Sequence, residues 1–154
     1  MNATLTIDEP AFLNSIMAEF QKVKVPCQAE MANAFYEVVM KNFGSGDGED
    51  RPISWIGLGK GEPGSKYAKK VGREVATLEL DGELATSVWP VGEMEEYATV
   101  STTNQYASAH QWGEGNQPPR PFFPITGPEG ETVTQFTAQK CVDACDVELT
   151  RSLK

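Results

Sequence analysis

The sequence predicts a single α+β domain, residues 1–154, in which an antiparallel sheet of about four strands packs against N- and C-terminal helices. Apolar residues recur with helical periodicity at both ends of the chain, and residues that favour strands gather between them. Like elements follow one another in runs instead of alternating strictly between strand and helix, which favours an antiparallel sheet. The 154 residues, 40% of them hydrophobic, suffice for one domain with its own core.

Two consecutive helices are expected near the N-terminus. The first spans residues 8–23, with Asp8 as its cap and Pro10 in its first turn, where the missing N–H of proline costs nothing. Its apolar stripe consists of Phe12, Leu13, Ile16, Met17 and Phe20. The second helix spans residues 26–43 and is ended by Gly44. Its buried face is predicted to consist of Met31, Ala34, Phe35, Val38 and Val39.

A flexible loop and a basic segment are expected next. Residues 44–52 (GSGDGEDRP) hold no large apolar side chain, which predicts a loop that is either an arm ordering on a partner or a plain connector. Residues 53–73 are expected to be irregular, and they carry the basic cluster Lys60, Lys66, Lys69, Lys70 and Arg73. We interpret these charges as a solvated face, with an acidic partner surface or DNA as the alternatives.

Residues 75–103 are predicted to be mostly extended. Residues that favour strands recur in this segment: Val75, Thr77, Val88, Val91, Tyr97, Thr99 and Val100. Asp81-Gly82 marks a turn that leads into a short helical turn at residues 83–87. Pro90-Val91-Gly92 and the acidic residues after it indicate a second turn, between two antiparallel strands.

The C-terminal third is predicted to contain two helices and a small hairpin. A short helix or turn is expected at residues 106–113, and the hairpin at residues 125–133. Residues 117–124 cannot be regular structure, because four prolines remove backbone donors. The terminal helix is expected from 135 to 153, with one face formed by Ala138, Val142, Cys145 and Leu149.

The chain is acidic, with a formal net charge of -9 and a pI near 4.6. This balance argues against a protein that grips DNA phosphates, which needs clustered Lys and Arg, and against docking on an anionic membrane. No leader peptide or membrane-spanning run is predicted from the sequence. An acidic surface suits a wall past which DNA slides without binding, and simple solubility is the alternative reading of the charge.

The candidate chemical residues do not predict a catalytic, cofactor or metal site. Cys27, Cys141 and Cys145 are odd in number and are expected to be free thiols packed in the core of a protein in a reducing cytoplasm. Zinc held by Cys141 and Cys145 with Cys27 or His110 is a less favoured alternative, because only one pair has a short spacing, and a redox role or inter-subunit bonding is the other. A lone His110 near Ser108 is more typical of a structural residue than of a catalytic triad.

The most informative segment runs from Asn104 to Ile125 (NQYASAHQWGEGNQPPRPFFPI). Its first part contains Tyr106-Ala107, His110-Gln111 and Gly113, and its second part is Pro119-Arg120-Pro121-Phe122-Phe123. This segment resembles the phage virion morphogenesis family, the tail-completion proteins of contractile-tailed phages, in which a YA-x-x-HQ-x-G element precedes PARPF. Pro119 stands where that family usually has Ala, and Trp112 where it often has Phe.

Two blocks upstream extend the resemblance to about residues 53–125. Leu80 to Val88 is similar to the family's L-x-x-[ST]G-x-L-x-x-S-[IV] block, with Asp81 in place of Ser or Thr. The tryptophan-then-YA region of the family is similar to Trp55 followed by Lys66-Tyr67-Ala68.

The resemblance implies a structural virion protein and not an enzyme. The subunit would form a ring at the head–tail junction, a hexamer if it matches the tail tube, and would terminate or complete the tail. Its partners would be other copies of itself, the tail tube protein and neck or head-completion proteins, with DNA passing through the lumen without specific binding and assembly taking place in the host cytoplasm. The alternatives are a neck adaptor or head-closure protein and, in another class, a monomeric phage-encoded binding module absent from the virion.

The family motif implies assembly roles for seven residues. They are Tyr106, His110, Gln111, Trp112, Arg120, Pro121 and Phe122. The prolines pre-set an extended backbone that loses little entropy on docking, and the Arg120 guanidinium suits a carboxylate or carbonyl cluster. The alternative is a role within the subunit, in which Arg120 bonds carbonyls near His110 and Phe122 belongs to the core.

Overall fold

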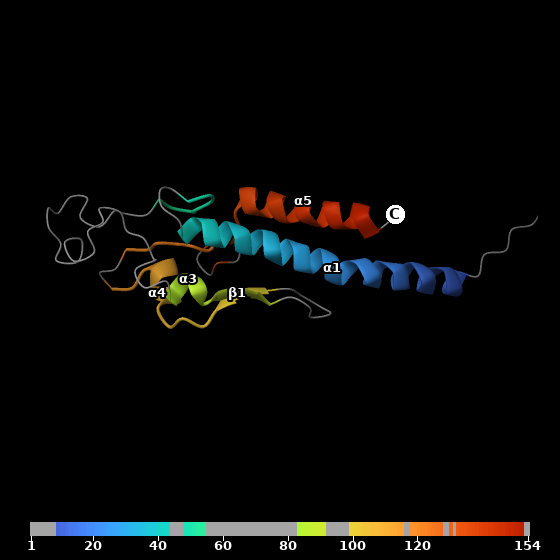
Figure 1. Ribbon diagram of the computed structural model, residues 1–154, viewed down its shortest axis with the longest axis horizontal. Helices are drawn as coiled ribbons and strands as arrows, with labels where there is room; N and C mark the ends of the chain where they lie inside the picture. The colour runs from blue at the N-terminus through green and yellow to red at the C-terminus, as the bar shows by residue number, and fades with distance from the viewer. Residues whose placement is uncertain are drawn as a thin grey trace, which may run out of the picture.

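The computed structural model describes residues 9–43, 48–54, 83–91, 99–115, 118–127, 130 and 132–152. These residues form a mixed helix-and-strand protein with a long helix at one end of the chain and a second helix at the other (Figure 1). In chain order the elements are α1 (Glu9–Phe43), α3 (Glu83–Thr86), β1 (Val88–Val91), β2 (Thr99–Thr102), α4 (Ala107–Trp112), β3 (Ile125–Thr126), β4 (Thr132–Val133) and α5 (Gln135–Ser152).

A single helix, α1, replaces the two helices expected at the N-terminus. It has 35 residues and passes through Pro26 without ending, so the expected break near residue 26 is wrong. A proline inside a helix removes one backbone hydrogen bond, but good helix formers on both sides and packing against α5 keep the chain helical. At 1.5 Å per residue the helix is about 50 Å long.

Helix α5 runs antiparallel to the C-terminal half of α1 and lies beside it (Figure 1). The Cys27 thiol donates to the carbonyl oxygen of Cys145 at 3.7 Å, and the Cys141 thiol donates to that of Met31 at 3.4 Å. These two contacts show the antiparallel register, because the later residue on α1 meets the earlier residue on α5. All three cysteines are free thiols at or near this contact, and Cys27 and Cys141 are buried, which confirms the expected core packing for these two.

The buried face of α5 differs from the predicted one. The helix buries Thr137, Cys141 and Glu148, whereas the predicted face members Ala138 and Val142 are exposed. The apolar pattern pointed to the wrong residues because two of the three buried side chains are polar. Their burial depends on hydrogen bonds and ion pairs that hydrophobic periodicity does not register.

The strands of the described residues form two separate two-stranded antiparallel sheets, and not the single sheet of about four strands that was expected. In the first sheet Val88 pairs with Thr102, and Val91 pairs with Thr99. Pro90 and Val91 lie within β1, whereas the rest of the expected turn, from Gly92 to Glu96, lies outside the described residues. The second sheet is the hairpin of β3 and β4, as predicted.

Helix α1 lies between α5 on one side and the β1–β2 sheet with α3 and α4 on the other (Figure 1). The main core lies between α1 and the side that holds the β1–β2 sheet, α3 and α4. Its buried residues are Val39, Phe43, Leu84, Ala85, Val88, Ala107 and Phe122. Phe122 stacks at a tilt against Phe43, with ring centroids 4.9 Å apart, and against Phe123 at 4.8 Å.

Several sequence predictions fall on residues outside the described ranges. They include the cap Asp8, residues 44–47 of the expected loop, Trp55, the basic cluster of residues 60–73, Tyr67-Ala68, the strand residues Val75, Thr77 and Tyr97, and the Asp81-Gly82 turn. Within the described ranges, no helix is both long and apolar enough to cross a membrane.

Candidate assembly site

The two parts of the motif in residues 104–125 are joined by one buried side chain, Gln111. It projects from α4, and its carboxamide oxygen accepts hydrogen bonds from the backbone N–H of Phe122 at 3.1 Å and of Phe123 at 3.0 Å. Its amide nitrogen donates to the carbonyl oxygen of Phe123 at 3.2 Å. Beside this clamp, the backbone N–H of Arg120 donates to the carbonyl of His110 at 2.6 Å. The proline-rich segment is thus held against α4 by four hydrogen bonds, three of which the Gln111 side chain makes.

Asn42, near the end of α1, bonds to the same segment. Its amide nitrogen donates to the carbonyl oxygens of Phe122 and Asp50, each at 3.0 Å. Its carboxamide oxygen accepts from the backbone N–H groups of Glu49 at 3.0 Å and Asp50 at 2.9 Å. Asn42 is fully buried, and these four bonds use both of its donors and both acceptor positions.

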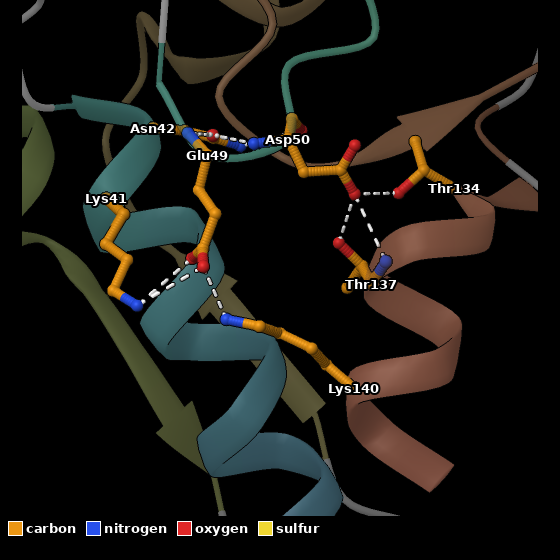
Figure 2. A network of polar contacts seen from close by, with 7 residues as sticks. All are labelled: Lys41, Asn42, Glu49, Asp50, Thr134, Thr137 and Lys140. Atoms are coloured by element: carbon orange, nitrogen blue, oxygen red, sulfur yellow. Dashed lines mark hydrogen bonds and ion pairs between the residues drawn. The ribbon is translucent and has the colours of Figure 1, made fainter. Parts of the chain in front are cut away.

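The segment that follows α1 also caps α5 (Figure 2). One carboxylate oxygen of Asp50 accepts hydrogen bonds from the Thr134 hydroxyl, from the Thr137 hydroxyl and from the backbone N–H of Thr137. Thr137 is the third residue of the helix, so Asp50 satisfies a backbone donor that the helix itself leaves unpaired. Its negative charge also lies at the helix terminus where the macrodipole favours an anion.

Glu49 adds ion pairs between the two long helices. Its carboxylate lies 2.5 Å from the Lys140 nitrogen on α5 and 3.3 Å from the Lys41 nitrogen on α1 (Figure 2). Burial raises the pKa of Glu49, but the hydrogen bonds and charges of Lys140 and Lys41 outweigh burial and lower it overall. The hydrogen bond to Glu49 correspondingly raises the pKa of Lys140. Both groups therefore stay ionised over a wide range around neutral pH.

The seven motif residues divide between the interior and the surface. Gln111, Pro121 and Phe122 are buried, and His110 and Arg120 are half-buried. Burial lowers the pKa of His110, and the nearby charge of Arg120 lowers it further, so the imidazole is mainly neutral at pH 7. The buried members belong to the subunit's own core, which agrees with the intra-subunit alternative for Phe122.

Two motif residues, Tyr106 and Trp112, are exposed at the start and end of α4. The indole of Trp112 is held in place because one edge packs on the hairpin. A Cβ atom added at Gly130 would lie 2.8 Å from the Trp112 ring, and the positive φ of Gly130 already favours glycine. Trp112 therefore combines an orientation fixed by its own chain with a face that is open to solvent.

The acidic side chains of this site are engaged by other groups of the protein. The carboxylates of Glu49 and Asp50 are engaged by lysines, threonines and a backbone amide, as described above. Among the residues with a described position, no group of three or more His, Cys, Asp or Glu side chains is arranged to hold a metal ion. In this arrangement polar side chains hold separate backbone segments together.

Sequence reasoning missed the residues that make the longest-range connections. Asn42, Glu49, Asp50, Thr137 and Lys140 were not singled out, and residues 44–52 were expected to be a flexible loop. Thr134, directly before α5, is a recognisable N-cap residue type and was the one available local signal. Nothing in the sequence indicated that Asp50, 84 positions earlier, bonds to it.

Comparisons with known proteins found no match: no family model, no curated protein and no solved structure is significantly similar to this chain.

Proposed function

We propose that this chain is a structural subunit of a tailed virus that completes or terminates the tail and joins it to the neck of the head. The proposal rests on the resemblance of residues 53–125 to tail-completion proteins, most specifically on the His110-Gln111 and Arg120-Pro121-Phe122 elements. In this reading the protein has no catalytic role and resides in the virion.

The observation that carries the proposal is the direct bonding between the two halves of that motif. Two elements of one family signature are expected to pack together if the signature serves a single structural purpose. Here Gln111 of the first element makes three hydrogen bonds to Phe122 and Phe123 of the second. The motif therefore behaves as one structural unit, as a family signature that preserves an assembly surface would.

The proposed interface lies around the exposed motif aromatics. Tyr106 and Trp112 stand on α4, whose position is fixed by the Gln111 clamp and the core. A ring would use this surface on one copy against a different surface on the next, because closed rings have heterologous contacts. The net charge of -9 suits a lumen through which DNA passes without binding.

Immunogold labelling of purified virions tests this proposal. Gold particles confined to the head–tail junction support it, and the same label on the head shell or tail tip contradicts it. Absence of the chain from purified virions also contradicts it, and that result would favour the monomeric binding module. A virus complemented with Trp112→Ala should show fewer joined particles than one complemented with Trp89→Ala, which removes an exposed tryptophan outside the motif.

A further inference from the structure

Two of the three thiols face each other across the contact between α1 and α5. The Cys27 thiol, on α1, lies 3.7 Å from the carbonyl oxygen of Cys145, on α5. Burial, followed by a hydrogen bond to the Cys145 thiol and the charge of that group, raises the pKa of Cys27 to about 11. The two sulfur atoms are therefore close neighbours, and at neutral pH Cys27 is almost entirely a protonated thiol.

The packing of the two helices places these residues at a separation that a disulfide can bridge. The axes of helices packed side by side are about 8–10 Å apart, and each Cα atom lies about 2.3 Å from its axis. Facing Cα atoms are then about 3.4–5.4 Å apart at the closest point, which overlaps the roughly 4.4–6.8 Å found in disulfides. Cys27 and Cys145 occupy such facing positions, because the thiol of one contacts the backbone of the other.

The third thiol, Cys141, is not placed to compete for Cys145. It lies one turn earlier on α5 and donates to the carbonyl oxygen of Met31 at 3.4 Å. Side chains four residues apart on a helix have Cβ atoms about 5–6 Å apart, beyond the roughly 3.5–4.5 Å that a disulfide spans. Met31 in turn lies about 6 Å along the helix from Cys27, so Cys141 is also displaced from Cys27. Of the three thiols, Cys27 is thus the partner that Cys145 can reach.

The two facing thiols differ in their access to solvent in the way that stepwise oxidation requires. Cys145 is partly exposed, whereas Cys27 is buried. A small dissolved oxidant therefore reaches Cys145 first, and Cys27 lies beside it to resolve the product. Redox-active cysteines commonly combine an accessible thiol with a resolving thiol of this kind.

We propose that Cys27 and Cys145 are a redox-active pair that closes into an intramolecular disulfide when the protein meets a small-molecule disulfide such as oxidised glutathione. In the first step the Cys145 thiolate attacks one sulfur of the oxidised glutathione, forms a mixed disulfide and releases one glutathione thiolate, which takes up a proton. In the second step the Cys27 sulfur loses its proton and attacks the Cys145 sulfur, which releases the second glutathione. Two protein thiols are oxidised to one disulfide, and one glutathione disulfide is reduced to two thiols.

The bond would tie α5 to α1 beyond the polar contacts described above. Asp50 and Glu49 hold α5 at Thr137 and Lys140, which lie in its first two turns. Cys145 lies later in the helix, and its partner is 118 positions away in the chain. Closing so long a loop strongly restricts the unfolded chain, so the disulfide should raise the melting temperature by about 5–15 °C.

The disulfide rests on the α1–α5 contact alone, and only its timing rests on the proposed function. Thiols stay reduced in a cytoplasm such as the one in which assembly is proposed, and they become prone to oxidation once particles are released. The two helices would then be unlinked during assembly and locked together afterwards.

Thiol titration and mass spectrometry of the purified full chain test the pair. The native protein is equilibrated with oxidised glutathione at low protein concentration, quenched with acid and digested with trypsin. The wild type should lose two of its three free thiols and yield a cross-link between peptides 25–41 and 141–151. Reduction with dithiothreitol should reverse both the cross-link and the rise in melting temperature.

Two serine variants identify the thiols involved. Cys141→Ser is the matched control, because serine keeps a donor for the Met31 carbonyl, and it should cross-link like the wild type. Cys145→Ser should stay reduced and should show no rise in melting temperature, because its two remaining thiols are buried.

Four results would overturn the proposal. They are three free thiols in the treated wild type, a glutathione adduct that persists on Cys145, a disulfide that links two chains instead of one, and oxidation of Cys145→Ser to the extent of the wild type. An oxidised wild type that melts no higher than the reduced protein would overturn the locking of the helices. A pair that closes in a chain absent from virions stands without the proposed function, and a pair that fails to close leaves that function to be decided by the immunogold label.

Discussion

Replacing Asn42 with alanine should remove the connection on which the packing of the motif most depends. This fully buried side chain makes four hydrogen bonds of 2.9–3.0 Å, to the backbone of Glu49, Asp50 and Phe122. The Asn42→Ala variant leaves two N–H groups and two carbonyl oxygens facing a small cavity. It also loosens the segment that caps α5, because Asp50 is positioned by two of those bonds.

The expected loss follows from the number of bonds and their burial. A net hydrogen bond contributes about 0.5–1.5 kcal/mol, and a buried polar group left unpaired costs about 1–3 kcal/mol. Partial relaxation and water entry reduce the sum, so we expect a loss of about 3–5 kcal/mol in the free energy of unfolding, at the upper end for point mutants. For a chain of this size the melting temperature should fall by roughly 6–20 °C.

Urea unfolding followed by circular dichroism measures this loss. Asn104→Ala is the matched control, because the side-chain oxygen of Asn104 accepts a single hydrogen bond, from the backbone N–H of Tyr106 at 2.9 Å, near the surface. It should cost about 1 kcal/mol or less. If Asn42→Ala costs no more than Asn104→Ala, then the network around Asn42 does not hold the α1 end, the loop and the motif together.

Three further substitutions follow from the same contacts. Gln111→Leu should lower the free energy of unfolding by about 2–4 kcal/mol in urea titrations, and a loss below about 1 kcal/mol would refute the clamp. Pro26→Ala should raise it by about 1–3 kcal/mol, since α1 is continuous through this residue; no gain would indicate a helix break there. Glu49→Gln should cost about 1 kcal/mol at pH 7. Because the pKa of Glu49 is lowered in the native state, the ion pair stabilises the fold above the ordinary pKa of a glutamate, and this stabilisation is lost as the pH falls through the native pKa. At alkaline pH the stabilisation is lost again, when Lys140 deprotonates above its raised pKa. A wild-type-to-variant difference that is constant from acid to alkaline pH would contradict the ion pair.

The elements that the sequence predicted well are those with local signals. The terminal helix was expected at residues 135–153 and spans Gln135–Ser152, and the short helix and the hairpin also occur where expected. A cap residue, an apolar period or a Gly-Pro turn specifies such elements within a few positions. Pro26 was misleading, because a strong local breaker was outweighed by helix formers on both sides and by tertiary packing.

The connections between elements were beyond the reach of the sequence. Asp50 caps a helix that begins 85 positions later in the chain, and Asn42 bonds to Phe122 across 80 positions. No periodicity encodes such partners, because each depends on how the whole chain folds. For the motif, the resemblance selected Gln111 without indicating its role as a clamp, and of the seven motif residues the structure leaves Tyr106 and Trp112 exposed.

Electron microscopy of lysates from a virus lacking this gene tests the central claim most directly. We predict DNA-filled heads lying beside unjoined tails, with overlong tails if the subunit terminates tube growth, and restoration of joined particles by the wild-type chain. Normal joined particles in the absence of the gene would contradict the proposed role at the head–tail junction.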